Sequence, residues 1–278
     1  MRVLVTGATG RIGRRFVPRL LQHVSAVRVL ARDAGRAEPL RERGAQVVLG
    51  DLREAGDRAA ALDGADAVVH LGAAFRGVPD AEALAVNQAA TVDLAAQAGR
   101  RRFVLASTNL VYGPGRGRPA REDDELRPPP GAYPTSKAAA EAALGELHAD
   151  HGLGLRTVRL AFVYGEGDPH LGESLRWATT WPAHKRLQLV HHADAGLGLL
   201  RALLTEGVDG RTFNLADDAP LSTVELYGLL GRRIPPEAHE RQLDDPWEGI
   251  VDTARARAEL GWRPLFPSVW TARDAGAL

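Results

Sequence analysis

Short apolar runs alternate with helix-like segments along the first 160 residues. The runs predict buried strands at residues 3–5, 27–30, 47–49, 67–70, 103–106 and 156–160. Apolar residues recurring every three to four positions predict helices at 11–22, where Pro18 should introduce a kink, and at 53–62, 80–99 and 133–151. Strands that are apolar on both faces and separated by helices form parallel sheets covered on both sides. We therefore expect an α/β fold with a doubly wound, Rossmann-type sheet.

The alternation weakens after Gly165. Residues 168–186 resemble an insertion carrying a helix, with Trp177 and Trp181 on one face. Strands are expected at 187–190 and 212–215, and helices at 193–204, 223–230 and 253–260. We predict a dinucleotide-binding domain made of residues 1–164 and 187–234. Residues 165–186 and 235–278 would form a small C-terminal substrate-binding subdomain.

Composition excludes several function classes. The 278 residues contain 35 Lys plus Arg and 35 Asp plus Glu, so the formal net charge of zero favours neither nucleic acid nor an anionic membrane as partner. Cysteine is absent, which rules out disulfides and thiolate sites, and the spacing of the histidines predicts no metal site. The chain has no apolar run of 18 residues and starts with a strand pattern rather than a signal peptide. We expect a cytoplasmic protein that acts on a small molecule.

A glycine-rich loop, Gly7-Ala8-Thr9-Gly10-Arg11-Ile12-Gly13, follows the first strand and opens the first helix. Glycines at such a turn let backbone amides approach a pyrophosphate, and the helix N-terminus adds positive potential. A purely structural turn is the alternative. The position between a strand and a helix favours a dinucleotide site.

Lysine is scarce in this chain: only Lys137 and Lys185 occur, so 33 of the 35 basic residues are arginine. A lysine retained in such a chain indicates a place where a compact ammonium is needed and a planar guanidinium does not fit. Lys137 follows Tyr133 by four residues, which places both on one helix face. The pair is a candidate catalytic site, although a Tyr-x-x-x-Lys spacing also arises by chance.

With these motifs, the sequence resembles an extended short-chain dehydrogenase/reductase of the epimerase/dehydratase branch. The opening phrase Val-Leu-Val-Thr-Gly-Ala-Thr-Gly-Arg-Ile-Gly matches that family's signature. Further matching phrases are Asp51-Leu52, His70-Leu71-Gly72-Ala73-Ala74, Val111-Tyr112-Gly113, Arg159 with Val163-Tyr164-Gly165, Val190-His191 with Asp194, and residues 259–264.

The resemblance implies a catalytic trio. Tyr133 would exchange a proton with a substrate oxygen while hydride moves to or from nicotinamide. Lys137 would bind the nicotinamide ribose and favour the phenolate. Thr108 would hydrogen-bond the reacting oxygen, with Ser107 as fallback, and Asn87 would support the site unless it is merely a helix-face asparagine. The implied cofactor contacts are Gly7, Thr9, Gly10, Arg11, Ile12, Gly13, Arg32, Asp51, Leu52, Leu71, Gly72, Ala73, Asn87, Tyr133 and Lys137.

The end of the second strand predicts which cofactor binds. In many NAD-binding sheets, a carboxylate at the end of the second strand hydrogen-bonds the ribose 2′-hydroxyl. In this sequence Ala31 occupies that position, and Arg32 follows it. A guanidinium suits the 2′-phosphate of NADP, and Arg11 could add a second contact. Asp33 keeps NAD open as an alternative. We predict NADP.

Two departures from the family bear on the substrate. Phe162 replaces an asparagine that contacts substrate in nucleotide-sugar epimerases, and Asn109-Leu110 stand where dehydratases often have Asp-Glu. We predict an oxidoreductase that interconverts a ketone and a secondary alcohol. Alternatives are a nucleotide-sugar epimerase or dehydratase that recycles its cofactor, and a non-catalytic NADP sensor. Candidate substrate contacts, which core packing could also explain, are Phe75, Asn109, Phe162, Trp177, Trp181 and His192.

The resemblance also implies a homodimer. Relatives commonly pack the helix that carries Tyr-x-x-x-Lys against its symmetry mate, and the small side chains at 138–143 would permit close approach.

Overall fold

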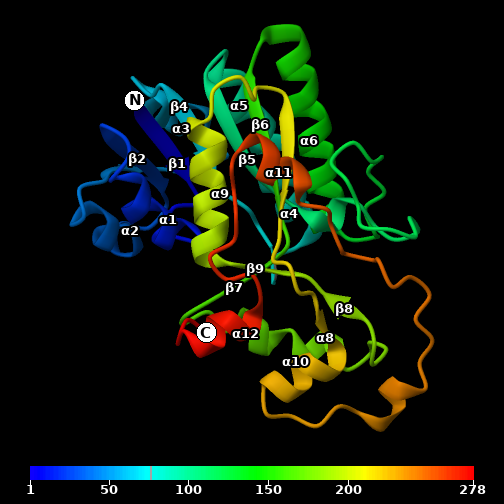
Figure 1. Ribbon diagram of the computed structural model, residues 1–278. Coiled ribbons are helices and arrows are strands. Elements are labelled where there is room, and N and C mark those ends of the chain that lie inside the picture. Colours follow the sequence, from blue (N-terminus) through cyan, green and yellow to red (C-terminus); the bar gives the residue numbers. More distant parts are fainter. Residues whose placement is uncertain (76) are drawn as a thin grey trace.

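A parallel sheet organises the computed structural model, which describes residues 1–75 and 77–278 (Figure 1). Within this described part, the central sheet has seven strands in the order β10-β6-β5-β4-β1-β2-β3. They are β1 (Arg2–Thr6), β2 (Ala26–Ala31), β3 (Gln46–Leu49), β4 (Ala67–His70), β5 (Arg102–Thr108), β6 (Gly154–Leu160) and β10 (Arg211–Leu215). The direction of the strand order reverses between β1 and β4, so the predicted doubly wound fold is confirmed.

Both faces of the sheet are buried, as the continuous apolar runs predict. In β1, Val3 and Val5 join one apolar cluster, and Leu4 joins the cluster on the other face. Helices α1 (Gly13–Leu20), α2 (Ala34–Arg41) and α9 (His192–Leu204) contribute to the first cluster. Helices α3 (Ala55–Leu62), α5 (Thr91–Ala98) and α6 (Ala132–His151) contribute to the second.

Helix α1 begins two residues later than the sequence predicts, because residues up to Ile12 belong to the glycine loop. Helix α2 was not predicted. Its N-cap is Asp33, whose side chain accepts a hydrogen bond from Arg36 N at 3.0 Å, and only Ala37 and Leu40 of this helix are buried. So few apolar positions give no recognisable period, which is why the pattern missed it.

The helix predicted at 80–99 is continuous but not uniform. It consists of α4 (Asp80–Leu84), a π-helical stretch η1 (Ala85–Ala90) and α5. Asn87 lies in η1 and is fully buried. Single π-helical turns often occur at functional sites because they redirect a side chain.

The strand predicted at 187–190 is divided in two. β8 (Arg186–Leu187) pairs antiparallel with β11 (Leu221–Ser222), whereas β9 (Leu189–His191) pairs parallel with β7 (Phe162–Tyr164). Gln188 between them turns its side-chain amide to the backbone of Asp217 and Val251.

A third apolar cluster lies beyond the carboxyl ends of the sheet strands (Figure 1). Helices α7 (His170–Glu173), α8 (Leu175–Ala178), α10 (Thr223–Leu229) and α12 (Val269–Asp274) contribute to it, and the predicted insertion helix is the α7–α8 pair. Helix α12 was not predicted, and the division into two domains stays a prediction. No helix in the described part of the chain has the length and apolar character needed to cross a bilayer.

A buried polar network ties α6 to the sheet. Arg159 of β6 forms an ion pair with Glu141 of α6, with 2.6 Å between Nη2 and Oε2, and also donates to the Tyr112 hydroxyl at 2.7 Å. Tyr112 in turn donates to the Asn214 side chain of β10 at 2.8 Å. Burial raises the pKa of Tyr112 to about 12, against the opposing effect of Arg159, so the phenol stays protonated. The network fixes the helix that carries Tyr133.

Candidate active site

A cavity of about 960 Å³ lies at the carboxyl ends of the sheet strands, where the strand order reverses. This is where doubly wound sheets bind nucleotides. Its lining includes most of the predicted site residues: Gly7, Thr9, Gly10, Arg11, Ile12, Gly13, Arg32, Asp51, Leu52, Leu71, Gly72, Ala73, Phe75, Thr108, Asn109, Tyr133, Phe162, Trp181 and His192. Among the residues described, Asn87, Lys137 and Trp177 are not part of that lining.

Two glycines of the loop leave no room for a Cβ atom. Gly7 has a φ of 67°, and a Cβ atom there would lie 2.5 Å from the backbone nitrogen of Gly72. A Cβ atom on Gly13 would lie 2.4 Å from the carbonyl oxygen of Gly7. Backbone atoms therefore form this wall of the cavity, as a dinucleotide pyrophosphate requires. The loop geometry fits the predicted cofactor.

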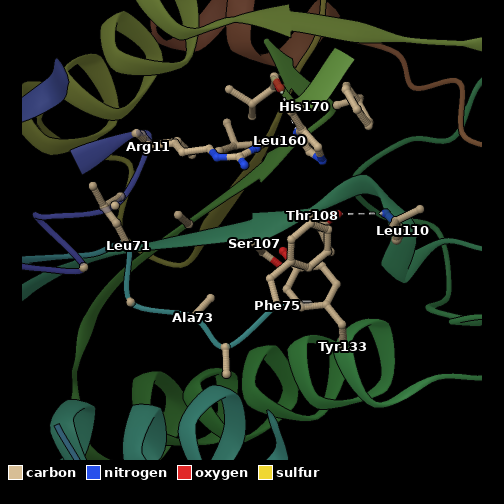
Figure 2. A pocket seen from close by; sticks show the side chains of 18 of the residues that line it. Arg11, Leu71, Ala73, Phe75, Ser107, Thr108, Leu110, Tyr133, Leu160 and His170 are labelled. Atoms are coloured by element: carbon tan, nitrogen blue, oxygen red, sulfur yellow. Dashed lines mark hydrogen bonds between the residues drawn. The ribbon is translucent and has the colours of Figure 1, made fainter. Parts of the chain in front are cut away.

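The candidate catalytic residues come from the end of β5 and the start of α6. Tyr133 starts the first turn of α6, and its ring lies edge-on to Phe75 with the ring centroids 4.4 Å apart. The Thr108 hydroxyl accepts a hydrogen bond from Leu110 N at 3.3 Å, which leaves its own proton available for donation. Figure 2 shows Ser107, Thr108 and Tyr133 gathered around Phe75.

Lys137 follows Tyr133 by one turn of α6. Its side chain is buried, and its ammonium donates to the carbonyl oxygen of Ala106 at 2.7 Å. Burial lowers the pKa of Lys137 to about 8, while the nearby Glu141 carboxylate opposes the shift. The predicted contact with a nicotinamide ribose would require the ammonium to extend from Ala106 toward the cavity.

Ser107 remains the alternative to Thr108. Its hydroxyl is buried in the lining of the cavity and has no hydrogen-bond partner within the described part of the chain. An unpaired buried hydroxyl costs free energy unless a ligand or water satisfies it. Both hydroxyls can therefore serve a bound oxygen.

Asn87 supports the cavity wall from behind. Its side-chain amide accepts from Ala74 N and donates to Ala74 O, both at 2.8 Å, and it also donates to the Ser136 hydroxyl at 3.2 Å. It thereby holds the segment that carries Phe75 against α6. The predicted direct contact between Asn87 and the cofactor has no support from this geometry.

His70, at the end of β4, joins two threonines below the cofactor end of the cavity. Its ring nitrogens contact the hydroxyls of Thr6 at 2.7 Å and Thr91 at 2.9 Å. Complete burial, with a smaller effect of Lys137, lowers the pKa of His70 to about 3. The imidazole is therefore neutral and structural.

Basic residues surround the end of β2. Arg32 is exposed at the cavity edge, and Arg36 of α2 donates to the carbonyl oxygen of Thr9 at 3.2 Å. Arg36 was missed because α2 was not predicted. The capping carboxylate of Asp33 was the signal that could have found it. Asp51 binds Arg53, which lowers the pKa of Asp51 to about 2 against the effect of burial.

Arg11 does not join those arginines. Its guanidinium forms an ion pair with Asp168, with 2.8 Å between Nη1 and Oδ1. Asp168 also accepts from His192 Nε2 at 2.6 Å and from the backbone nitrogen of His170 at 3.0 Å. Burial would raise the pKa of Asp168, but these hydrogen bonds outweigh it and lower the pKa to about 2. The predicted second contact from Arg11 to a 2′-phosphate is therefore not supported.

The other end of the cavity is largely aromatic. Phe75, Phe162 and Trp181 line it as predicted, together with His170, which the sequence analysis did not select. The Asn109 side chain donates to the carbonyl oxygen of Gly249 at 2.8 Å, so it anchors a neighbouring segment. The Lys185 ammonium pairs with Glu248 at the same end. No cluster of three or more metal-ligating side chains occurs in the part of the chain that is described.

Comparison with known proteins gives the family. The family model "NAD dependent epimerase/dehydratase family" matches residues 3–219. One relative, from Stigmatella aurantiaca, is named 4-hydroxy-2-methyl-3-oxo-4-farnesyl-3,4-dihydroquinoline-1-oxide ketoreductase. It is 31% identical to this chain, and the alignment covers 96% of this chain and 82% of the relative. A dTDP-glucose 4,6-dehydratase from Streptomyces griseus is 32% identical, covering 94% and 89%.

A solved structure shows the same architecture. The dTDP-glucose 4,6-dehydratase from Streptomyces venezuelae, determined with NAD bound, superimposes with a TM-score of 0.79 at 26% identity, over 99% of this chain and 97% of its own. The family match covers more than half of the sequence. The glycine loop and the Tyr133–Lys137 pair agree with it. The chain is an extended short-chain dehydrogenase/reductase and belongs to the NAD-dependent epimerase/dehydratase family.

Proposed function

We propose that the protein is an NADP(H)-dependent oxidoreductase that interconverts a ketone and a secondary alcohol on a small molecule. The proposal is supported by one observation: Thr108 and Tyr133 line the same cavity as the glycine loop, and the buried Lys137 ammonium donates to Ala106, two residues before Thr108. A protein that only senses a dinucleotide needs the loop but not this trio.

Each residue of the trio has a distinct task in ketone reduction. When bound, NADPH would supply the hydride that adds to the carbonyl carbon. Tyr133 donates its phenolic proton to the carbonyl oxygen, and Thr108 orients that oxygen through its hydroxyl. The Lys137 ammonium stabilises the phenolate that remains until solvent returns the proton. One hydride and one proton thus convert the ketone to the alcohol, and the reverse sequence oxidises it.

The arginines at the end of β2 support NADP over NAD. Arg32 and Arg36 line the cavity, and a guanidinium matches the geometry of a phosphate. Asp33, the carboxylate that could have served the ribose of NAD, instead caps α2. The NAD bound in the Streptomyces venezuelae dehydratase keeps NAD as the competing cofactor.

Replacing both arginines should reverse the cofactor preference. We expect Arg32→Ala combined with Arg36→Ala to lower kcat/KM for NADPH by about 100-fold, because hydrogen bonds to charged groups each contribute roughly 1.5–3 kcal/mol. The value for NADH should change by less than about threefold. Arg41→Ala is the control, since Arg41 lies on the same helix but pairs with Glu38. An equal loss with both cofactors would contradict the NADP assignment.

Net consumption of the cofactor distinguishes a reductase from a nucleotide-sugar epimerase or dehydratase, the alternative that the Streptomyces griseus relative favours. A ketoreductase consumes one NADPH for each alcohol formed, whereas an epimerase or dehydratase regenerates its cofactor within each turnover. We expect absorbance at the reduced-cofactor band to fall in a one-to-one ratio with substrate. Turnover of a nucleotide sugar without net change in absorbance would establish the alternative.

We also propose a homodimer in which α4, η1 and α6 meet their symmetry mates. A shallow groove on this surface is lined mainly by small or apolar side chains: Leu84, Ala85, Gln88, Ala89, Val92, Asp93 and Ala143. Leu84 is 42% exposed in the single chain and would be covered at such an interface.

A further inference from the structure

Three rings form a continuous wall at the substrate end of the cavity. The Phe162 and His170 rings are stacked, with centroids 4.0 Å apart and planes inclined by 21°. Phe75 meets His170 edge-on at 6.0 Å and also contacts Tyr133. Figure 2 shows His170 and Phe75 carried by separate segments of the chain, with Tyr133 next to Phe75.

Each ring is held by its backbone or by a hydrogen bond. Asn87 fixes the backbone of Ala74, next to Phe75, and the pairing of β7 with β9 fixes Phe162. The imidazole of His170 contacts the carbonyl oxygen of Val163 through Nδ1 at 3.1 Å. Phe75 is nevertheless 39% exposed, so its ring remains accessible although Asn87 holds the adjacent backbone. A surface held in this way loses little conformational entropy when a ligand binds.

Two polar side chains at this end already have partners within the protein. The Asn109 amide binds Gly249, and Lys185 pairs with Glu248. Phe162 offers a ring face and no hydrogen bond to the ligand. Other side chains of this part of the lining, Val78, Val86, Leu110, Pro129 and Leu187, are apolar. These apolar side chains and the ring faces of Phe75 and Phe162 would contact a flat ring closely.

We propose that Phe75, Phe162 and His170 select a planar aromatic ketone, or the corresponding alcohol, as the substrate class. Its ring system lies against the wall, and its carbonyl group reaches Tyr133 and Thr108. The inference rests on the proposed function, because it names the substrate of the same site. Phe162 and His170 act as specificity-determining residues and take no part in proton transfer.

Two bicyclic ketones of equal size test the wall. We expect the wild-type enzyme with NADPH to reduce 2-tetralone with a kcat/KM at least about tenfold above that for trans-2-decalone, which lacks the aromatic ring. Phe162→Leu should lower this ratio about threefold to tenfold, the range that an aromatic pair contributes. His170→Leu should act in the same direction. Phe266→Leu is the matched control, since Phe266 contacts His191 away from the described cavity lining and should leave the ratio unchanged.

Binding measured without turnover keeps the two proposals separate. Titration calorimetry of the NADPH-loaded enzyme should show 2-naphthol binding at least about tenfold tighter than trans-2-decalol, with the difference reduced in the Phe162→Leu and His170→Leu variants. Selective binding of 2-naphthol without reduction of either ketone would contradict the proposed function and uphold the aromatic wall. Equal affinities for the two alcohols, or a selectivity unchanged in both variants, would overturn the wall whatever the activity.

Discussion

Replacing Tyr133 with phenylalanine should lower kcat for ketone reduction by about 1,000-fold, since general acid catalysis contributes roughly 10²–10⁴-fold. The substitution removes only the hydroxyl and keeps the ring that packs against Phe75. Thr108 still orients the substrate oxygen, but no side chain then supplies the proton. Cofactor affinity should change by less than about twofold, which tryptophan fluorescence titration with NADPH would measure.

Tyr227→Phe provides a control of the same chemical size. Tyr227 is buried in the apolar cluster beyond the sheet and lies outside the described cavity lining, so its variant should retain wild-type kcat. Wild-type turnover in Tyr133→Phe would remove the proposed acid. Unimpaired biological activity in a variant with no turnover would favour a dinucleotide sensor over an enzyme.

Lys137→Arg should lower kcat by at least about 100-fold, although it preserves the charge. Lys137 is 1% exposed and its ammonium donates to one carbonyl oxygen, so a longer, planar guanidinium would have to displace its buried neighbours. Lys185→Arg is the matched comparison, since Lys185 is partly exposed and its ion pair with Glu248 can be kept by arginine. Similar activity in both variants would show that the scarcity of lysine has no catalytic meaning.

Replacing Lys137 with an uncharged residue should lower activity but raise the stability of the folded protein. The pKa of Lys137 is lowered by burial from its ordinary 10.5 to about 8 in the folded protein, so between these values the unfolded chain binds a proton that the folded chain lacks. Stability therefore rises with pH across this window, and below pH 8 the buried charge costs on the order of 3 kcal/mol. Lys137→Met should raise the free energy of unfolding at pH 7 in urea titrations while turnover is lost.

In the wild-type enzyme, kcat should fall as pH rises through about 8, as the ammonium is lost.

The fold was predictable because its strands are buried on both faces. Burial on both faces requires consecutive apolar residues, such as Val3–Val5, and such runs are recognisable in the sequence. The pairing of Tyr133 with Lys137 was predictable from their helical spacing, whereas Thr108 was selected through the resemblance to the family. Helix α2 was not predictable, since only two of its residues are buried, and Arg36 was missed with it.

Other parts of the site depend on contacts between distant segments. His170 was missed for a different reason: its hydrogen bonds to the nearby Asp168 and Val163 leave no hydrophobic period in the sequence. The direction of Arg11 follows from an ion pair with a residue 157 positions away. Trp177 and Trp181 looked equivalent in the sequence, yet only Trp181 lies in the described cavity lining.

Asp168 connects the two ends of the cavity through a single carboxylate. One oxygen holds Arg11 of the glycine loop together with the backbone of His170, and the other holds His192. A cofactor that draws Arg11 toward its pyrophosphate therefore changes the restraint on the aromatic wall. The affinities for cofactor and substrate are then thermodynamically linked, and the linkage is reciprocal: whatever factor the cofactor imposes on substrate binding, the substrate imposes on cofactor binding.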